Sequence, residues 1–139
     1  MSSLFVRNTL EGFLAANWTD TKVYVIDDHE DISSLPANTT EAWVGVEYLA
    51  STDQVDCLPA NMWKERGTIL LHVVIPNGWK SSHGITLGDK LQRMLRGQRL
   101  DDLVIESVSP VIGTSPPALP RTSSWQGFCL VSQYQSIRS

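Results

Sequence analysis

The stretch Gly67–Ile75 (GTILLHVVI) constrains the fold of this chain more than any other part of it. Thr68 and His72 are its only polar side chains, and the rest is mostly aliphatic. A run that is apolar on both alternating faces is typical of a strand covered on both sides. Pro76–Gly78 follows, and we expect the strand to end there because proline cannot donate to a ladder and glycine accepts a turn. The sequence therefore predicts a central, buried strand.

Two segments show the spacing of amphipathic helices. The first begins after Ser2 or Ser3 and the second after Ser81 or Ser82, since serine favours the N-cap position. The residues that recur at helical spacing are Val6, Leu10, Phe13, Leu14 and Asn17 in the first segment, and Ile85, Leu87, Leu91, Met94 and Leu95 in the second. Gly97 is placed to end the second helix.

The remaining strands are shorter or more polar. We predict them at Lys22–Ile26, Glu41–Ala50, Leu103–Val108 and Trp125–Tyr134. Residues 61–66 are expected to form a connection, and residues 109–124, rich in proline and serine, a loop. Because helices and strands do not alternate strictly, the order predicts an α+β fold in one domain over residues 1–139, with a mostly antiparallel sheet and two helices packed on one face.

Composition excludes some functions. The 139 residues include 11 Lys and Arg against 15 Asp and Glu, so the formal charge is 11 − 15 = −4. A protein that coats nucleic acid would need a basic surplus. Charged residues make up only 19% of the chain, which leaves surface for protein contacts. We find no signal-peptide pattern, no bilayer-spanning run and no disulfide framework, and we expect an intracellular product with reduced thiols.

Catalytic and metal-binding patterns are weak. Asp27–Asp31 is an acidic loop whose carboxylates and His29 could bind a metal, yet it lacks the spacing of a calcium-binding loop. Cys57 and Cys129 could serve as nucleophiles with His29, His72 or His83 as a base, and no local signature joins any such pair. We therefore predict no enzyme, no cofactor and no metal; the alternative is a small metal- or ligand-binding module that uses Asp27–Asp31.

Contact residues are easier to nominate. Trp63 and Trp79 are placed in the connections that flank the central strand, where large aromatic residues often anchor interfaces. A loose basic stripe on the second helix consists of Lys90, Arg93, Arg96 and Arg99. From these features we nominate Trp63 and Trp79 as candidate interface residues, whereas a solvated face or salt bridges to a neighbouring acidic surface is the default for the basic stripe that includes Arg93 and Arg96.

The order of motifs resembles one known family. A run Gly67–Gly78 precedes a capped, glycine-containing helix, and Pro116 and Pro117 precede an aromatic final strand, Trp125–Tyr134. Together with the leading helix and the strand near Trp43–Tyr48, this order resembles the tail-terminator, or tail-completion, proteins of long-tailed bacteriophages and prophages. The resemblance spans most of the chain, although the 109–124 loop is longer than the family usually needs.

The resemblance implies a structural role without catalytic residues. Such proteins form a ring, usually six-fold, that caps the tail tube, ends its polymerisation and joins it to the head connector. The implied partners are copies of this chain, the tail tube protein and the head–tail connector, with DNA only passing through the lumen and no membrane. The implied location is the virion tail, assembled in the bacterial cytoplasm. In such a ring we expect Arg93 and Arg96 to face acidic residues such as Asp27–Asp31.

Overall fold

The protein is described here from a computed structural model, which defines residues 3–26, 41–57, 62–76, 79–112 and 125–138. Within these ranges, two helices and six strands follow one another. In order they are α1 (Leu4–Asn17), β1 (Lys22–Ile26), β2 (Trp43–Cys57), β3 (Met62–Pro76), α2 (Ser81–Leu95), β4 (Arg99–Leu100), β5 (Leu103–Val108) and β6 (Trp125–Arg138). The acidic loop Asp27–Asp31, Cys57's side chain and most of the 109–124 loop lie outside what can be described.

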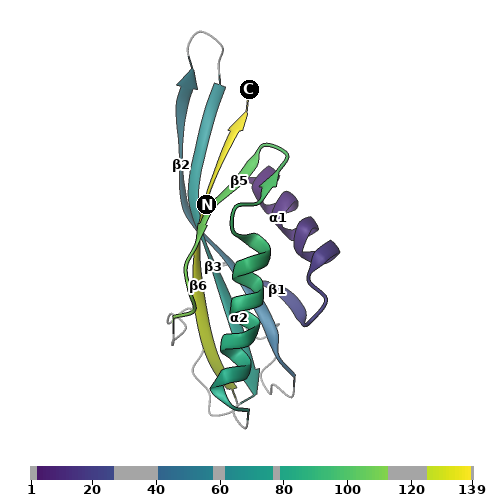
Figure 1. The fold of residues 1–139 in the computed structure, drawn as a ribbon. Helices are drawn as coiled ribbons and strands as arrows, with labels where there is room; N and C mark the ends of the chain where they lie inside the picture. Colours follow the sequence, from purple (N-terminus) through teal and green to yellow (C-terminus); the bar gives the residue numbers. More distant parts are fainter. Residues whose placement is uncertain (1–2, 27–40, 58–61, 77–78, 113–124, 139) are drawn as a thin grey trace.

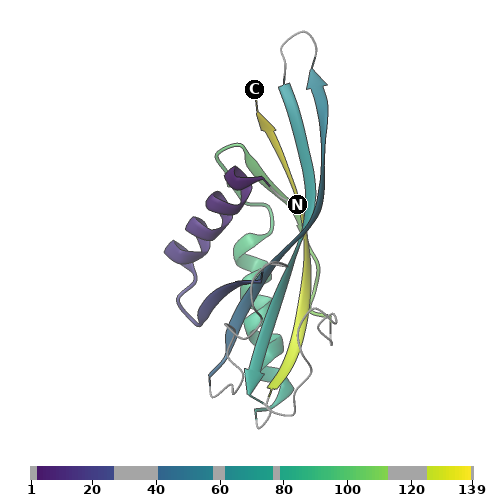
Figure 2. The same ribbon diagram turned by 180° about the vertical axis from the view of Figure 1, so that it is seen from behind.

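The strands form one sheet of order β1-β2-β3-β6-β5-β4. Every neighbouring pair is antiparallel except β1 and β2, which run parallel. Figures 1 and 2 show a long, twisted sheet with α1 and α2 on the same side. The predicted α+β class, with a mostly antiparallel sheet and two helices on one face, is confirmed.

The main core lies between the helices and this face of the sheet. Val6, Leu10 and Leu14 of α1 pack into it, as the helical spacing predicted. Leu91 and Leu95 of α2 enter the same core. Each such side chain contributes about 1.5–3 kcal/mol on burial, so this layer is the principal source of stability. The Ser3 hydroxyl accepts a hydrogen bond from the Val6 N–H at 3.4 Å and caps α1 as predicted.

The central strand is longer than predicted, and the expected connection at 61–66 is wrong. β3 begins at Met62, and Trp63 is therefore a strand residue, paired with Val55 on β2 and Arg138 on β6. We call the projecting ribbon formed by residues 51–57, 62–66 and 135–138 the arm (Figure 1). The helix layer covers only the base of the arm, so its strands need no apolar alternation, and this is why residues 61–66 were expected to form a connection.

The second helix differs from its prediction at its N-terminal half. Lys80 is the N-cap, without a side-chain hydrogen bond, and Ile85 is exposed. The buried positions there are Gly84 and Gly88, where an added Cβ would lie 2.5 Å from a Phe128 ring carbon and 2.2 Å from Val111 Cγ2 respectively. Glycine thus permits α2 to approach the sheet closely.

The arm is joined to α1 by a buried carboxylate. Glu65 accepts hydrogen bonds from the Tyr134 hydroxyl at 2.7 Å and from the Ser3 N–H at 3.1 Å. Tyr134 reaches this position across Gly67, its cross-strand neighbour, whose missing side chain leaves room for the ring. An aromatic residue that covers a glycine on the adjacent strand is a known way to stabilise such a pair.

Gly67→Ala should destabilise the fold. Its Cβ would lie 2.5 Å from the Tyr134 hydroxyl oxygen and 2.7 Å from Cζ, and the ring cannot move without weakening its bond to Glu65. We expect a loss of about 1–3 kcal/mol in the free energy of unfolding, measured by chemical denaturation. Gly12→Ala is the control, because nothing lies within 4 Å of that position on the exposed side of α1. It should instead gain up to about 1 kcal/mol; equal effects at both sites would contradict the packing described.

Candidate functional site

The two nominated tryptophans are exposed at opposite ends of the central strand. Trp63 is 50% exposed near the start of β3, and Trp79 is 39% exposed just beyond its end. At the rise of an extended strand, the 13 residues from Trp63 to Pro76 span about 40 Å. The structure therefore does not bring Trp63 and Trp79 together; it exposes them as two separate aromatic side chains.

Trp79 is held in place by its neighbours. Its N–H donates to the Pro76 carbonyl at 3.0 Å, and its own carbonyl accepts from Gln126 Nε2 at 3.2 Å. Its ring lies edge-on to His83 at 5.4 Å between centroids. An exposed aromatic side chain with a fixed backbone loses little conformational entropy on docking, which is a property of interface anchors.

At the other end of β3, a hydrogen bond links the strand of Trp63 to the start of α1. Glu65 is two residues further along β3, on the same face as Trp63, and it binds the N–H of Ser3. Leu4, the next residue, is 71% exposed. Leu4 and Trp63 are therefore exposed apolar residues close in sequence to Ser3 and Glu65, the pair that joins α1 to the arm.

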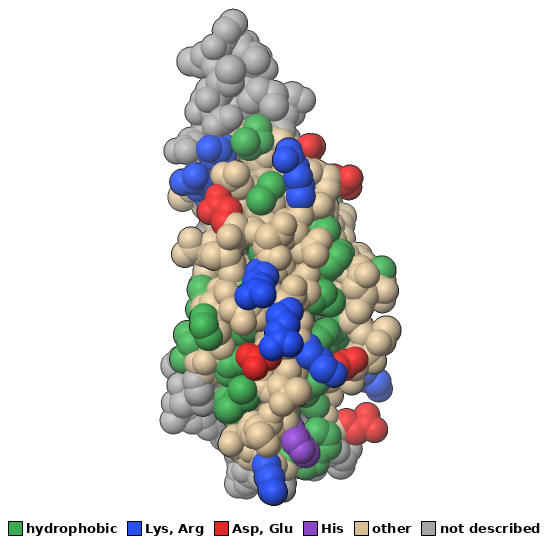
Figure 3. Space-filling view, viewed as in Figure 1, with side chains coloured by type: hydrophobic (Ala, Val, Ile, Leu, Met, Phe, Trp, Pro, Cys, Tyr) green, Lys and Arg blue, Asp and Glu red, His purple; other side chains and the backbone are tan. Residues whose placement is uncertain are grey.

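The nominated arginines lie on the outer side of α2. Arg93 and Arg96 are exposed, and Lys90 beside them forms an ion pair with Asp20 at 3.0 Å. Figure 3 shows Lys and Arg side chains spread over this face of the molecule. Arg93 lies in the last turn and Arg96 is the C-cap, so both positive charges lie at the negative end of the helix dipole. Their expected partner Asp27–Asp31 lies outside the described residues.

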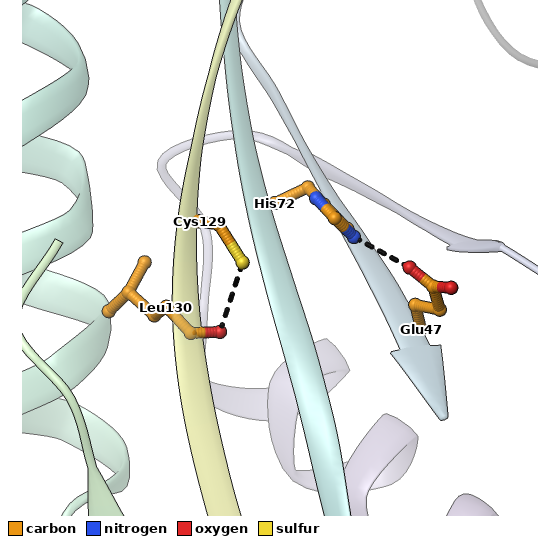
Figure 4. Close-up of polar contacts among 4 residues, drawn as sticks. All are labelled: Glu47, His72, Cys129 and Leu130. Carbon is orange, nitrogen blue, oxygen red and sulfur yellow. Dashed lines mark hydrogen bonds and ion pairs between the residues drawn. The ribbon is translucent and has the colours of Figure 1, made fainter. Parts of the chain in front are cut away.

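A row of polar residues crosses the opposite face of the sheet. His72 lies directly between Gly45 on β2 and Cys129 on β6, and its Nε2 is 2.9 Å from the Glu47 carboxylate (Figure 4). All three polar side chains of this row are buried, and Nδ1 of His72 has no hydrogen-bond partner among the described residues. Sequence reasoning found His72 and Cys129 singly but missed Glu47, because only strand register places the three side by side.

The Glu47–His72 hydrogen bond in this row has the properties of a buried structural pair. Burial lowers the pKa of His72, and the hydrogen bond and charge of Glu47 oppose that shift. Burial and the nearby Glu47 charge raise the pKa of Cys129 to about 11, so its thiol stays protonated. The Cys129 sulfur is 3.7 Å from the Leu130 carbonyl oxygen rather than bonded to the imidazole (Figure 4). A protonated, buried thiol is a poor nucleophile.

Other candidate sites are small. A hollow of about 230 Å³ is lined by Arg66, Gly67, Thr68, Glu106, Gln133 and Tyr134. Arg66 and Glu106 approach each other there at 4.0 Å, with half-exposed side chains that water screens. Within the described ranges, no three His, Cys, Asp or Glu side chains are grouped so that they could bind a metal ion. The helices described are too short or too polar to cross a bilayer.

Comparison with known proteins bears on the architecture of the chain. Seventeen chains of solved structures match. One of them, a protein whose name states no activity, aligns over 100% of this chain and 97% of its own with a TM-score of 0.62 and 14% identity. No protein-family model matches, and no curated protein does so significantly. At this identity the likeness concerns the architecture alone.

Stability should fall in mild acid because of His72. The pKa of His72 in the folded protein lies below the value of about 6.5 in the unfolded chain. Between these two pKa values the unfolded state therefore binds a proton on His72 and the folded state does not. The free energy of unfolding should therefore decrease as the pH falls below about 6.5, by up to about 1.4 kcal/mol per pH unit until the folded pKa is reached.

The test is to measure the free energy of unfolding by urea denaturation between pH 7.5 and pH 5. This range brackets the pKa of a free imidazole, about 6.5. His72→Gln should lower stability at neutral pH yet flatten its pH dependence. His83→Gln removes an exposed imidazole and is the matched control, expected to keep the slope of the wild-type protein. An unchanged slope in His72→Gln would contradict this assignment.

Proposed function

We propose that this chain is a structural tail-assembly protein of a phage or prophage, a tail terminator. Its copies form a ring that caps the tail tube, ends tube polymerisation and joins the tube to the head connector. It acts in the virion tail after assembly in the host cytoplasm. The proposal combines the order of sequence motifs with the surface of the folded chain.

The observation that supports a ring most directly is the separation of Trp63 and Trp79. A head-to-tail ring needs two different patches on each subunit, one that meets the other on the next copy. Exposed aromatic side chains at the two ends of β3 provide two such patches. An isologous dimer would need only one.

Charge is consistent with the same role. The chain is acidic overall, yet five of its 11 basic residues lie in the segment Lys80–Arg99, which contains a single acidic residue, Asp89. We propose that Arg93 and Arg96 face an acidic surface of the neighbouring subunit. A net charge of −4 per chain would let DNA pass through the lumen without adhering.

The genetic test uses an inducible prophage that encodes this chain. Disruption of the gene should give tails of abnormal length, or tails without heads, in negative-stain images of the lysate. Complementation with the wild-type gene should restore tails of normal length that carry heads. Normal, infective particles from the disrupted strain would contradict the proposal.

Charge reversal on α2 should prevent ring closure. Arg93→Glu combined with Arg96→Glu places acids opposite acids at the proposed contact, and like charges juxtaposed there cost enough to reduce ring formation by roughly tenfold or more. Arg93→Lys with Arg96→Lys keeps the charge and is the control. Light scattering and negative-stain imaging, with and without tail tubes, measure the rings; intact rings in the double Glu variant would show that this contact is misassigned.

Removal of either tryptophan should weaken assembly while the fold stays intact. Trp63→Ser and Trp79→Ser each remove an anchor, and loss of about 2 kcal/mol at such a residue corresponds to roughly 30-fold weaker association. Ile112→Ser removes another exposed apolar side chain and is the control. Equal assembly of all three variants would contradict the two-patch contact, whereas a change in thermal stability alone would indicate a role in folding.

A further inference from the structure

One edge of the sheet has a step. β1 pairs with β2 only along Trp43–Glu47, whereas β2 continues to Cys57. Beyond Glu47, no described strand lies on the side of β2 that faces away from β3. Figures 1 and 2 show β2 at the outer border of the arm. Among the described residues, the edge therefore consists of a protruding part, β1, and a part recessed by one strand width, the segment Thr52–Cys57.

The opposite edge of the sheet is closed by different means. β4 is only two residues long, the Ile105 N–H is bonded to the Gln98 carbonyl at 2.9 Å, and the Gln92 side chain donates to the Val108 carbonyl at 2.9 Å. Short strands and covering side chains are the usual protection of sheet edges. At the stepped edge no described strand covers Thr52–Cys57, although the register of β2 shifts between Tyr48 and Ser51 and between Val55 and Cys57. β1 has a single charged residue, Lys22, followed by Val23, Tyr24 and Val25.

We propose that the stepped edge is an interface with a second copy of this chain, related by a two-fold axis. In this pairing β1 of each copy adds as an antiparallel strand beside Thr52–Cys57 of the other copy. The protruding half of one edge fills the recess of its partner, and the same contact is repeated on the other side of the axis. The result is a continuous sheet across the two molecules.

The dimensions of the step fit this arrangement. β1 has five residues and the recessed segment six, which correspond to about 17 and 20 Å of strand. A strand that is added to a free edge gains backbone hydrogen bonds where the ladder is regular, here Thr52–Val55, so the contact does not depend on particular side chains.

The sequence charges also favour β1 over the alternative of two β2 segments side by side. The segment Thr52–Cys57 includes two aspartates and no basic residue, and β1 includes one lysine and no acid. Pairing β2 with β2 would bring like-charged segments together, which is unfavourable across strands. Pairing β1 with β2 brings opposite charges together.

This interface differs from the ring contact proposed above. It is two-fold, whereas the ring is head-to-tail, and it uses the backbone edge rather than Trp63, Trp79 or the arginines of α2. It therefore predicts a dimer of the isolated full-length chain, whether or not the chain closes rings on a tail tube.

The first experiment is hydrogen–deuterium exchange of the wild-type chain, with light scattering, at protein concentrations of about 1 µM and about 300 µM, because dimerisation follows mass action. We expect a dimer at the higher concentration, with exchange slowed about tenfold or more at 22–26 and 52–57 and unchanged in α2. A monomer at the higher concentration would overturn the proposal. Protection that moves to α2, or that requires tail tube protein, would also overturn it.

A second experiment removes one outward N–H. Because amides alternate between the two edges of a strand, Thr52→Pro and Asp53→Pro are both made, and the variant that keeps the wild-type circular dichroism is studied. It should be monomeric, whereas alanine at the same position retains the N–H and should remain dimeric. A folded proline variant that still dimerises would overturn the proposal. Trp63→Ser should leave the dimer unchanged, so failure of the ring proposal and failure of this one are distinguishable.

Discussion

The backbone ladder of β3 is the constraint on which the rest of the structure depends. β2 and β6 flank β3 along nearly its whole length, from Met62 to Pro76. In its second half, residues 69–75, this strand is buried on both faces. It therefore fixes the position of the helix layer on one side and of the Glu47–His72 pair on the other. In its first half, at residues 62–66, the same ladder supports the arm, most of which the helix layer does not cover. Both exposed tryptophans owe their positions to the two ends of this single strand.

The parts of the fold that the sequence predicted are those where hydrophobic burial and secondary structure agree. Gly67–Ile75 is apolar because both of its faces are covered, and α1 shows its apolar stripe because one face packs on the sheet. The arm could not be predicted in this way, since its strands need no apolar face. The N-terminal half of α2 was misjudged for a related reason: Gly84 and Gly88 are its buried positions, and glycine has no hydropathy signal.

The candidate site, too, was predictable from the sequence only in part. Exposed Trp63 and Trp79 were nominated by residue type alone, which was sufficient to choose them but not to place Trp63 in a strand or to separate the two by the length of β3. The Glu47–His72–Cys129 row depends on the register of three strands that are distant in sequence, and a one-residue slip would turn each side chain to the other face. Such a row becomes visible only in the folded chain.

The Glu65 carboxylate has a mechanical consequence. It accepts hydrogen bonds from the Tyr134 hydroxyl and from the N–H of Ser3, the N-cap of α1, at the base of the arm. These two hydrogen bonds connect β6, β3 and the start of α1 through one buried carboxylate, so bending the arm at its base would strain both of them. A displacement of the arm would therefore be passed to the N-terminus of α1 through Glu65.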